Sequence, residues 1–158
     1  MRSAYRYTHC KSLADGGPQW LWVMLNPLSQ DSPQSPQTLS RMASFTRSGG
    51  GGGFFVAHLY AWTTPSAVDL FMLPERQRTG RINDRVIGQF VDEVRHQKLP
   101  GGRIVVAWGD HPKAESRASE VVKLLRVGGQ VHCLGTSKSG APRHPSYVPT
   151  SQKLVPFA

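Results

Sequence analysis

Cysteine is scarce in this chain of 158 residues, and the pattern of a metal site is missing. Its two thiols, Cys10 and Cys133, lie far apart without a CxxC pair, so we expect reduced structural cysteines rather than a disulfide. The pairs His9-Cys10 and His132-Cys133 suit a metal poorly, because neighbouring side chains of a strand point to opposite faces. We therefore predict neither a metal nor a cofactor.

Three common catalytic signatures are also missing: GxGxxG after a strand, GxxxxGK[ST] and GxSxG. The sequence therefore lacks the motifs typical of a dinucleotide-binding fold, a P-loop and a nucleophile-elbow hydrolase. The five glycines at 49–53 lack the strand-to-helix context of a phosphate loop and predict a mobile loop. No apolar run approaches the roughly 18 residues of a membrane span, and residues 1–10 are too polar for a secretory signal. We expect a cytoplasmic protein without membrane contact.

Acidic residues are few: 10 Asp and Glu stand against 19 Lys and Arg, which gives a formal charge of +9. Residues 121–158 contain no Asp or Glu at all. This imbalance favours an anionic partner, and we predict DNA, single-stranded or double-stranded. The basic residues predicted to contact it are Lys138, Arg143 and Lys153 near the last loop, and Arg78 and Arg81 in a second cluster. That second cluster could equally serve only to keep a loop soluble.

The length and the hydrophobic content of 39% predict one domain, residues 1–158, with a core of ordinary size. Apolar runs that alternate with helical patterns indicate βαβ units, so we expect a three-layer α/β/α fold with a mainly parallel four-stranded sheet. The expected strands are 20–25, 54–60, 103–108 and 130–134, with an antiparallel edge at 5–8. The expected helices cover 39–45, a short segment through Leu70, a helix capped by Asn83, and one from Pro112 to Gly128.

Ligands of such sheets collect where loops leave the carboxyl ends of the strands. Here those loops begin at Asn26, Trp62, Gly109 and Thr136. Asn26-Pro27 alone is typical of a turn, and the segment 140–149 alone is typical of an ordered proline-rich loop. Together they would bring an amide and an imidazole to the same edge of the sheet.

Six short segments form a recognisable set: Arg6-Tyr7, Met24-Leu25-Asn26-Pro27, the segment 56–65, Asn83-Asp84, Ala107-Trp108-Gly109 and the segment 140–145. In this order they resemble the bacterial and phage family called domain of unknown function 1643. The resemblance covers nearly the whole sequence and implies a fold more than a mechanism.

Two short motifs lie toward opposite ends of the chain, Met24-Leu25-Asn26-Pro27 and His144-Pro145-Ser146. They resemble the first and the last motif of the uracil-DNA glycosylase superfamily, whose core is a four-stranded parallel α/β/α sheet. The similarity implies that Asn26 positions the attacking water, that Asp31 is the nearest carboxylate base, and that His144 donates to the departing base. Tyr147 would follow at the position of a wedge into the base stack.

Base recognition would need an aromatic face and a polar edge contact. The candidate substrate-binding residues are Pro27, Phe45, His58, Tyr60, Trp62, Ser146 and Tyr147. Three functions stay open: a glycosylase-like enzyme that recognises or excises uracil or a modified base, a nucleic-acid-binding module without chemistry, and a small-molecule enzyme acting on nucleotides. The sequence leaves the oligomeric state undetermined.

Overall fold

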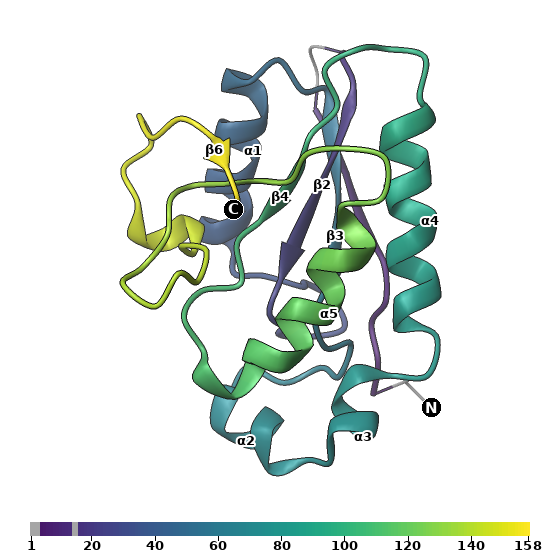
Figure 1. Ribbon diagram of the computed structural model, residues 1–158, viewed down its shortest axis with the longest axis vertical. Helices are drawn as coiled ribbons and strands as arrows, with labels where there is room; N and C mark the ends of the chain where they lie inside the picture. Colours follow the sequence, from purple (N-terminus) through teal and green to yellow (C-terminus); the bar gives the residue numbers. More distant parts are fainter. Residues whose placement is uncertain (1–3, 14–15) are drawn as a thin grey trace.

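The sheet has six strands, and the four central ones are parallel (Figure 1). The computed structural model describes residues 4–13 and 16–158. Neighbouring strands follow the order β1-β3-β2-β4-β5-β6, with β3, β2, β4 and β5 parallel and β1 and β6 antiparallel at the two edges. The strands are β1 His9–Ser12, β2 Gln19–Met24, β3 Gly53–His58, β4 Ile104–Val106, β5 His132–Cys133 and β6 Val155–Pro156. The predicted four-stranded parallel sheet is thus the centre of a larger mixed sheet.

Both edges differ from the sequence prediction. The antiparallel edge β1 pairs with β3 and lies four residues beyond the predicted segment 5–8, where Tyr5 forms only an isolated bridge with Trp62. The second edge, β6, was not predicted. A two-residue strand such as β6 is too short to show the alternation on which strand prediction depends.

Helices cover both faces of the sheet. The helix α1, Pro36–Ser48, packs on one face, while α4, Asn83–His96, and α5, Glu115–Leu125, pack on the other (Figure 1). Side chains of β2 alternate between the two layers: Trp20 and Trp22 join the core under α1, and Leu21 joins the core under α4 and α5. Because β2 is buried on both sides, its sequence is a continuous apolar run.

Hydroxyl caps set the starts of two helices. The Ser35 side chain accepts from the Thr38 N–H at the start of α1, and Ser66 does the same for Asp69 at the start of α2, Ala67–Met72. Residues 75–81, whose basic side chains predict a loop, contain a further short helix, α3, Glu75–Thr79. None of the helices in the described ranges combines the length and apolar character needed to cross a membrane.

Asn83 begins α4 as expected but does not cap it. The cap position belongs to Ile82, and the buried Asn83 amide instead donates to the carbonyl oxygens of His58 at 2.9 Å and Leu59 at 3.2 Å. Asn83 therefore joins α4 to the end of β3, a tertiary contact that local sequence does not reveal.

The five-glycine run is a packed turn rather than the predicted free loop. Gly51, Gly52 and Gly53 are buried. A Cβ added to Gly52 would lie 2.4 Å from the Gly16 carbonyl carbon and 2.5 Å from the Gly17 nitrogen. The absence of side chains lets two backbone segments approach closely.

We predict that Gly52→Ala lowers the free energy of unfolding by about 1–3 kcal/mol, because the new methyl group meets backbone that cannot turn away. Gly88→Ala in α4 is the matched control, since its Cβ would meet no atom within 4 Å. That change should raise stability by about 0.5–1 kcal/mol through helix propensity. Urea unfolding of both variants tests the prediction, and equal effects would contradict it.

Candidate functional site

The sheet has a crevice where chain connections diverge. After β2 the chain passes to α1 on one face, and after the neighbouring β4 it passes to α5 on the other. Such a switch point at the carboxyl ends of parallel strands is the usual ligand site of open α/β sheets. Two pockets open here, and both contain Gly109, Asp110, His111 and Pro142.

The first of these pockets, which we call the histidine pocket, has a volume of about 540 Å³. A turn at Gly109, with φ of +84°, carries the chain out of β4. A Cβ at Gly109 would lie 3.4 Å from His111 Nε2 and 3.7 Å from His144 Cβ, so both histidines lie beside this turn. The pocket is lined by Gly109, Asp110, His111, Ser137, Pro142, Arg143, His144 and Tyr147.

His144 presents a neutral ring in a fixed tautomer. Its Nδ1 accepts the Ser146 N–H at 3.1 Å, so the proton of the neutral ring resides on Nε2. Burial lowers the pKa of His144, and the nearby His111 lowers it further. At neutral pH this side chain is therefore an uncharged hydrogen-bond donor.

His111 is the second imidazole of the pocket. Burial lowers its pKa, opposed by the Asp110 carboxylate and by the Trp108 backbone. Because burial favours the neutral form, the ring carries one N–H donor and one acceptor nitrogen. Two neutral imidazoles thus share the pocket, and in one of them, His144, the N–H is fixed on Nε2.

Loop contacts hold the pocket walls in place. The Asp110 carboxylate accepts from Ser137 Oγ at 3.0 Å and Ser139 Oγ at 2.8 Å. Arg143 Nε donates to the Thr136 carbonyl, while most of that side chain stays exposed. Tyr147 is 81% exposed, and its ring centroid lies 5.7 Å from that of His144. The mouth of the pocket thus offers an aromatic face to solvent.

Asn26 lies outside both pockets. Its buried Nδ2 donates to the backbone carbonyls of Pro27 at 3.1 Å, Trp62 at 3.2 Å and Thr64 at 2.8 Å. The amide therefore fastens two loops together. Asp31, the predicted base, is exposed in the loop after β2 and also lines neither pocket. The structure does not bring these two side chains into the pocket of His144.

The two sequence motifs nevertheless share one edge of the sheet, joined through the start of α1. The Gln34 amide donates to the Asn26 carbonyl at 3.3 Å, and Thr38 Oγ1 lies 3.0 Å from Ser146 Oγ. Arg41 donates to the carbonyls of Pro145 and Val148, on either side of the 3₁₀ turn Pro145–Tyr147. These contacts fix the segment that carries His144.

Most of the other predicted substrate-binding residues belong to the core. Phe45 packs against Trp22, Tyr60 packs against Phe71, and Pro27 is buried. Trp62 is half-buried with its ring edge-on to Tyr5.

The predicted cationic residues divide into two groups. The Arg78 guanidinium lies 5.1 Å from the centroid of the Tyr60 ring and 5.2 Å from that of Phe71, and donates to the Leu73 carbonyl. It therefore stabilises the α2–α3 segment. Arg81, Lys138 and Lys153 are exposed and available to a partner.

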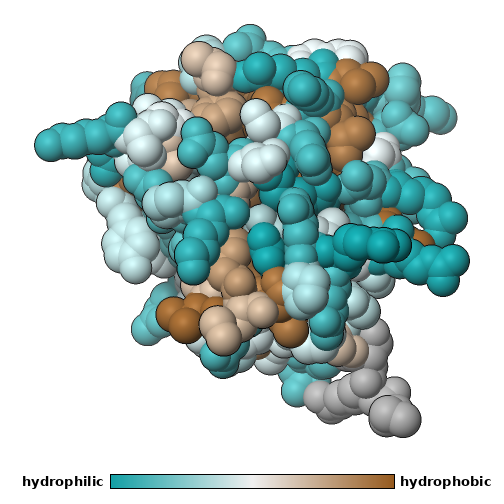
Figure 2. All heavy atoms as spheres, turned by 60° about the horizontal axis from the view of Figure 1, so that its bottom comes forward, coloured by the Kyte–Doolittle hydropathy of each residue, from teal (hydrophilic) through white to brown (hydrophobic). Residues whose placement is uncertain are grey.

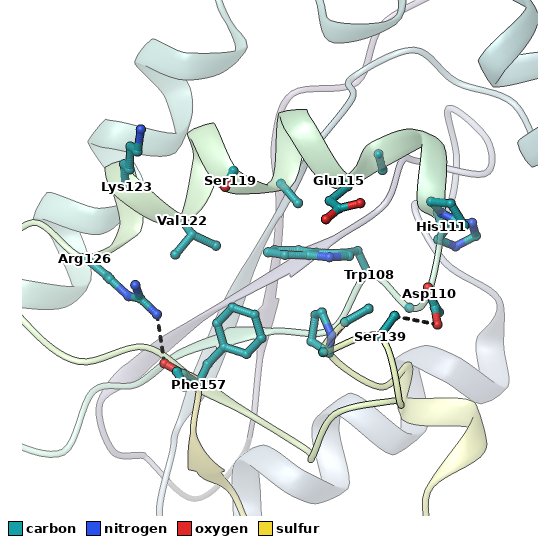
Figure 3. A pocket seen from close by; sticks show the side chains of 18 residues that line it. Trp108, Asp110, His111, Glu115, Ser119, Val122, Lys123, Arg126, Ser139 and Phe157 are labelled. Atoms are coloured by element: carbon teal, nitrogen blue, oxygen red, sulfur yellow. Dashed lines mark hydrogen bonds between the residues drawn. The ribbon is translucent and has the colours of Figure 1, made fainter.

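The second pocket, which we call the tryptophan pocket, has a volume of about 390 Å³ and lies between α5 and the C-terminal segment (Figure 3). Trp108 and Phe157 meet edge to face in it, with centroids 6.3 Å apart. Charged residues line it: Glu115 and Lys123 of α5, and Arg126 directly after that helix.

Sequence reasoning missed Asp110, His111 and Ser137. A signal existed, because Asp110-His111 directly follows the strand end at Gly109, one of the four expected ligand loops. Within residues 4–13 and 16–158 there is no group of three or more His, Cys, Asp or Glu side chains placed to hold a metal. Cys10 and Cys133 are free thiols.

The fold and the crevice define an α/β protein with an open, mostly parallel sheet and a polar pocket at its switch point. The chain belongs to the family described as "Protein of unknown function (DUF1643)", whose model matches residues 6–146. No curated protein and no solved structure matches the chain. The similarity to uracil-DNA glycosylases therefore stays a prediction from two short motifs.

His58, a predicted base contact, is fully buried, and neither ring nitrogen has a hydrogen-bond partner among the residues that the structure describes. Burial lowers its pKa from 6.5 to about 3, with smaller contributions from Arg6 and His9. The unfolded chain binds more protons than the folded one between these values, so stability is full above pH 6.5 and falls as the pH drops toward 3.

We predict that His58→Met weakens this acid sensitivity. In the wild type, His58 contributes a slope of up to about 1.4 kcal/mol per pH unit to the free energy of unfolding between pH 6 and 4. Urea unfolding across that range measures it. The exposed His96→Ala is the control and should keep the wild-type slope. An unchanged slope in His58→Met would remove His58 as the cause.

Proposed function

We propose that this protein binds DNA and takes one unstacked base into the histidine pocket. The observation that carries the proposal is the pairing of a donor imidazole, His144, with a second neutral imidazole, His111, in one pocket. Such a pocket reads the edge of a base by hydrogen bonds after the base has left the stack. Tyr147, exposed beside the pocket, offers a face for stacking.

The donor and acceptor suit a uracil-type base. Its edge carries a carbonyl oxygen next to a ring N–H. The carbonyl oxygen matches the His144 Nε2–H, and the ring N–H matches the acceptor nitrogen of a neutral His111. Neutral rings serve this purpose, because a doubly protonated imidazolium would lose the acceptor. The lowered pKa values of both histidines favour this state at pH 7.

The surface around the pocket supports an anionic partner. Figure 2 shows the face at the carboxyl ends of the strands, where hydrophilic side chains project around small apolar patches. Lys138 and Arg143 lie in the loop that closes the pocket, and the chain carries a net charge of +9. Phosphate contacts of this kind position a protein on DNA, while base contacts specify the target.

Excision of the bound base is the reaction that His144 supports. As an N-glycosidic bond breaks, negative charge develops on the base oxygen, and an aimed neutral donor stabilises it. Because the Asn26 amide donates to three backbone carbonyls, activation of the attacking water falls to another group. The alternative is a protein that recognises the base without excising it, and an assay of base release distinguishes the two functions.

We predict that replacing Lys138 and Arg143 together by Ala weakens DNA binding and reduces the slope of log affinity against log salt by about one for each lost phosphate contact. Arg47→Ala with Lys98→Ala is the charge-matched control. Arg47 lies in the last turn of α1 and Lys98 just after α4, so both precede the amino ends of strands, away from the pocket. Titrations by fluorescence anisotropy at several salt concentrations measure the slopes. The same slope in both double variants would place the DNA elsewhere.

We predict that His144→Ala slows release of free base by about 10²-fold in single-turnover assays, with DNA affinity nearly unchanged, because one transition-state donor is lost. The substrates are duplex and single-stranded DNA carrying uracil or 5-hydroxymethyluracil. Asn26→Ala should instead lower stability by about 1–3 kcal/mol through unpaired carbonyls. If the wild type binds DNA but releases no base, recognition without excision is the function.

A further inference from the structure

Three aromatic side chains near the end of β3 line neither pocket. Tyr5 and Tyr7 belong to the segment before β1, and Trp62 follows β3; all three are half-buried, so part of each residue meets solvent. The Tyr5 and Tyr7 rings are stacked with centroids 5.7 Å apart, and Trp62 meets Tyr5 edge to face with centroids 5.5 Å apart. The three rings form one aromatic cluster at the surface, which we call the tyrosine platform.

Contacts with the rest of the fold hold the tyrosine platform in place. Tyr5 and Trp62 form an isolated antiparallel bridge, and the Tyr5 hydroxyl donates to the Gln77 carbonyl of α3 at 2.7 Å. A Cβ at Gly80, directly after α3, would lie 2.7 Å from the Tyr7 hydroxyl, so Tyr7 lies against this turn. The platform is therefore fixed beside α3 (Figure 1). Rings that are already in place lose little conformational entropy when a ligand binds.

Exposed arginines border the tyrosine platform. Arg76 precedes the α3 residue that accepts from the Tyr5 hydroxyl, and Arg81 follows the turn that Tyr7 contacts; both side chains are exposed. Residues 75–85 hold four arginines against two acidic residues, and one of these two, Asp84, is paired with a buried arginine of α5. The platform thus combines aromatic rings with a local excess of positive charge.

We propose that the tyrosine platform binds single-stranded DNA, with unpaired bases stacked on its rings and phosphates at Arg76 and Arg81. Aromatic side chains beside cations suit a single strand, because every base has a face that can stack and every linkage carries a charge. In a duplex the base faces are covered by neighbouring bases, so only the phosphates are available. This surface goes beyond the proposed function and does not depend on the histidine pocket.

Fluorescence anisotropy with two labelled strands of equal length tests the stacking. An oligothymidylate should bind about tenfold or more tighter than a strand of abasic sites, because the abasic strand keeps the phosphates but has no bases to stack. The same ratio should persist in His144→Ala with Tyr147→Ala, which removes base contacts of the histidine pocket. Equal affinities in the wild type would overturn the proposal, and a ratio that disappears in this double variant would assign the bases to the histidine pocket instead.

Tryptophan fluorescence locates the bound strand. Of the four tryptophans, Trp20, Trp22 and Trp108 are at most 3% exposed, so the indole within reach of a ligand is that of Trp62. The oligothymidylate should quench the emission, the abasic strand should not, and Trp62→Phe should abolish the quenching. Unchanged emission when the wild type is saturated with oligothymidylate would overturn the proposal.

Substitutions at Tyr5 separate stacking from structure. Tyr5→Phe loses the hydroxyl but keeps the ring and should bind oligothymidylate like the wild type. Tyr5→Leu loses the ring and should bind it about tenfold more weakly, with duplex affinity unchanged. Urea unfolding confirms that each variant is folded. Wild-type affinity for oligothymidylate in Tyr5→Leu, or equal losses for single strand and duplex, would overturn the proposal.

The arginines are tested by salt dependence. Arg76→Ala with Arg81→Ala should reduce the slope of log affinity for oligothymidylate against log salt by about 0.7 for each lost phosphate contact. Arg47→Ala with Lys98→Ala is again the charge-matched control. Equal slopes in the two double variants would overturn the placement of the phosphates.

The assays of base release keep this proposal apart from the proposed function. Tyr5→Leu should release base from saturating duplex DNA at the rate of the wild type, since Tyr5 lines neither pocket. A wild type that releases no base would end the excision reading and leave the binding of single strands intact. Base release without any effect of Tyr5→Leu on single strands would do the reverse.

Discussion

The structure depends on hydrogen bonds to the backbone carbonyls just beyond β3, where the chain leaves the sheet. The Asn83 amide and Arg117 Nε both donate to Leu59, and the Asn26 amide donates to Trp62 and Thr64. Buried carbonyls without partners would each cost on the order of 1–3 kcal/mol. These donors come from three distant segments, so they tie α4, α5 and the loop after β2 to one short stretch of backbone.

Arg117 is the costliest of these donors to bury. Only 3% of it is exposed, and its charge is compensated by Asp84, whose Oδ1 lies 2.6 Å from a guanidinium nitrogen. Because Asp84 belongs to α4 and Arg117 to α5, the ion pair also sets how these two helices pack. Removing Asp84 would leave the buried Arg117 charge without this partner, and removing Arg117 would leave the Leu59 carbonyl without its Nε donor.

The carboxyl ends of the parallel strands, held by these contacts, support the loops that form the pockets. The Gly109 N–H donates to the Pro142 carbonyl at 3.0 Å, and Ser137 and Ser139 hold Asp110, so the last loop closes over the end of β4. The pocket residues are thus placed by a backbone contact between two loops together with side-chain hydrogen bonds to Asp110. A rigid frame of this kind lets a binding site select its ligand with little loss of entropy.

Local patterns were enough to predict the central strands and the helices α1, α4 and α5, because burial on both faces and helical periodicity leave direct marks in the sequence. The sequence also indicated that the segments of Asn26 and His144 meet at one sheet edge, since parallel strands end together. Which of these side chains faces a cavity depended on contacts between residues far apart. The Asn26 amide donates to three backbone carbonyls and has a structural role, whereas the turn at Gly109 places His111 near His144. The pocket was therefore decided by the tertiary structure, because hydrogen-bond partners across the fold determine which polar groups remain free.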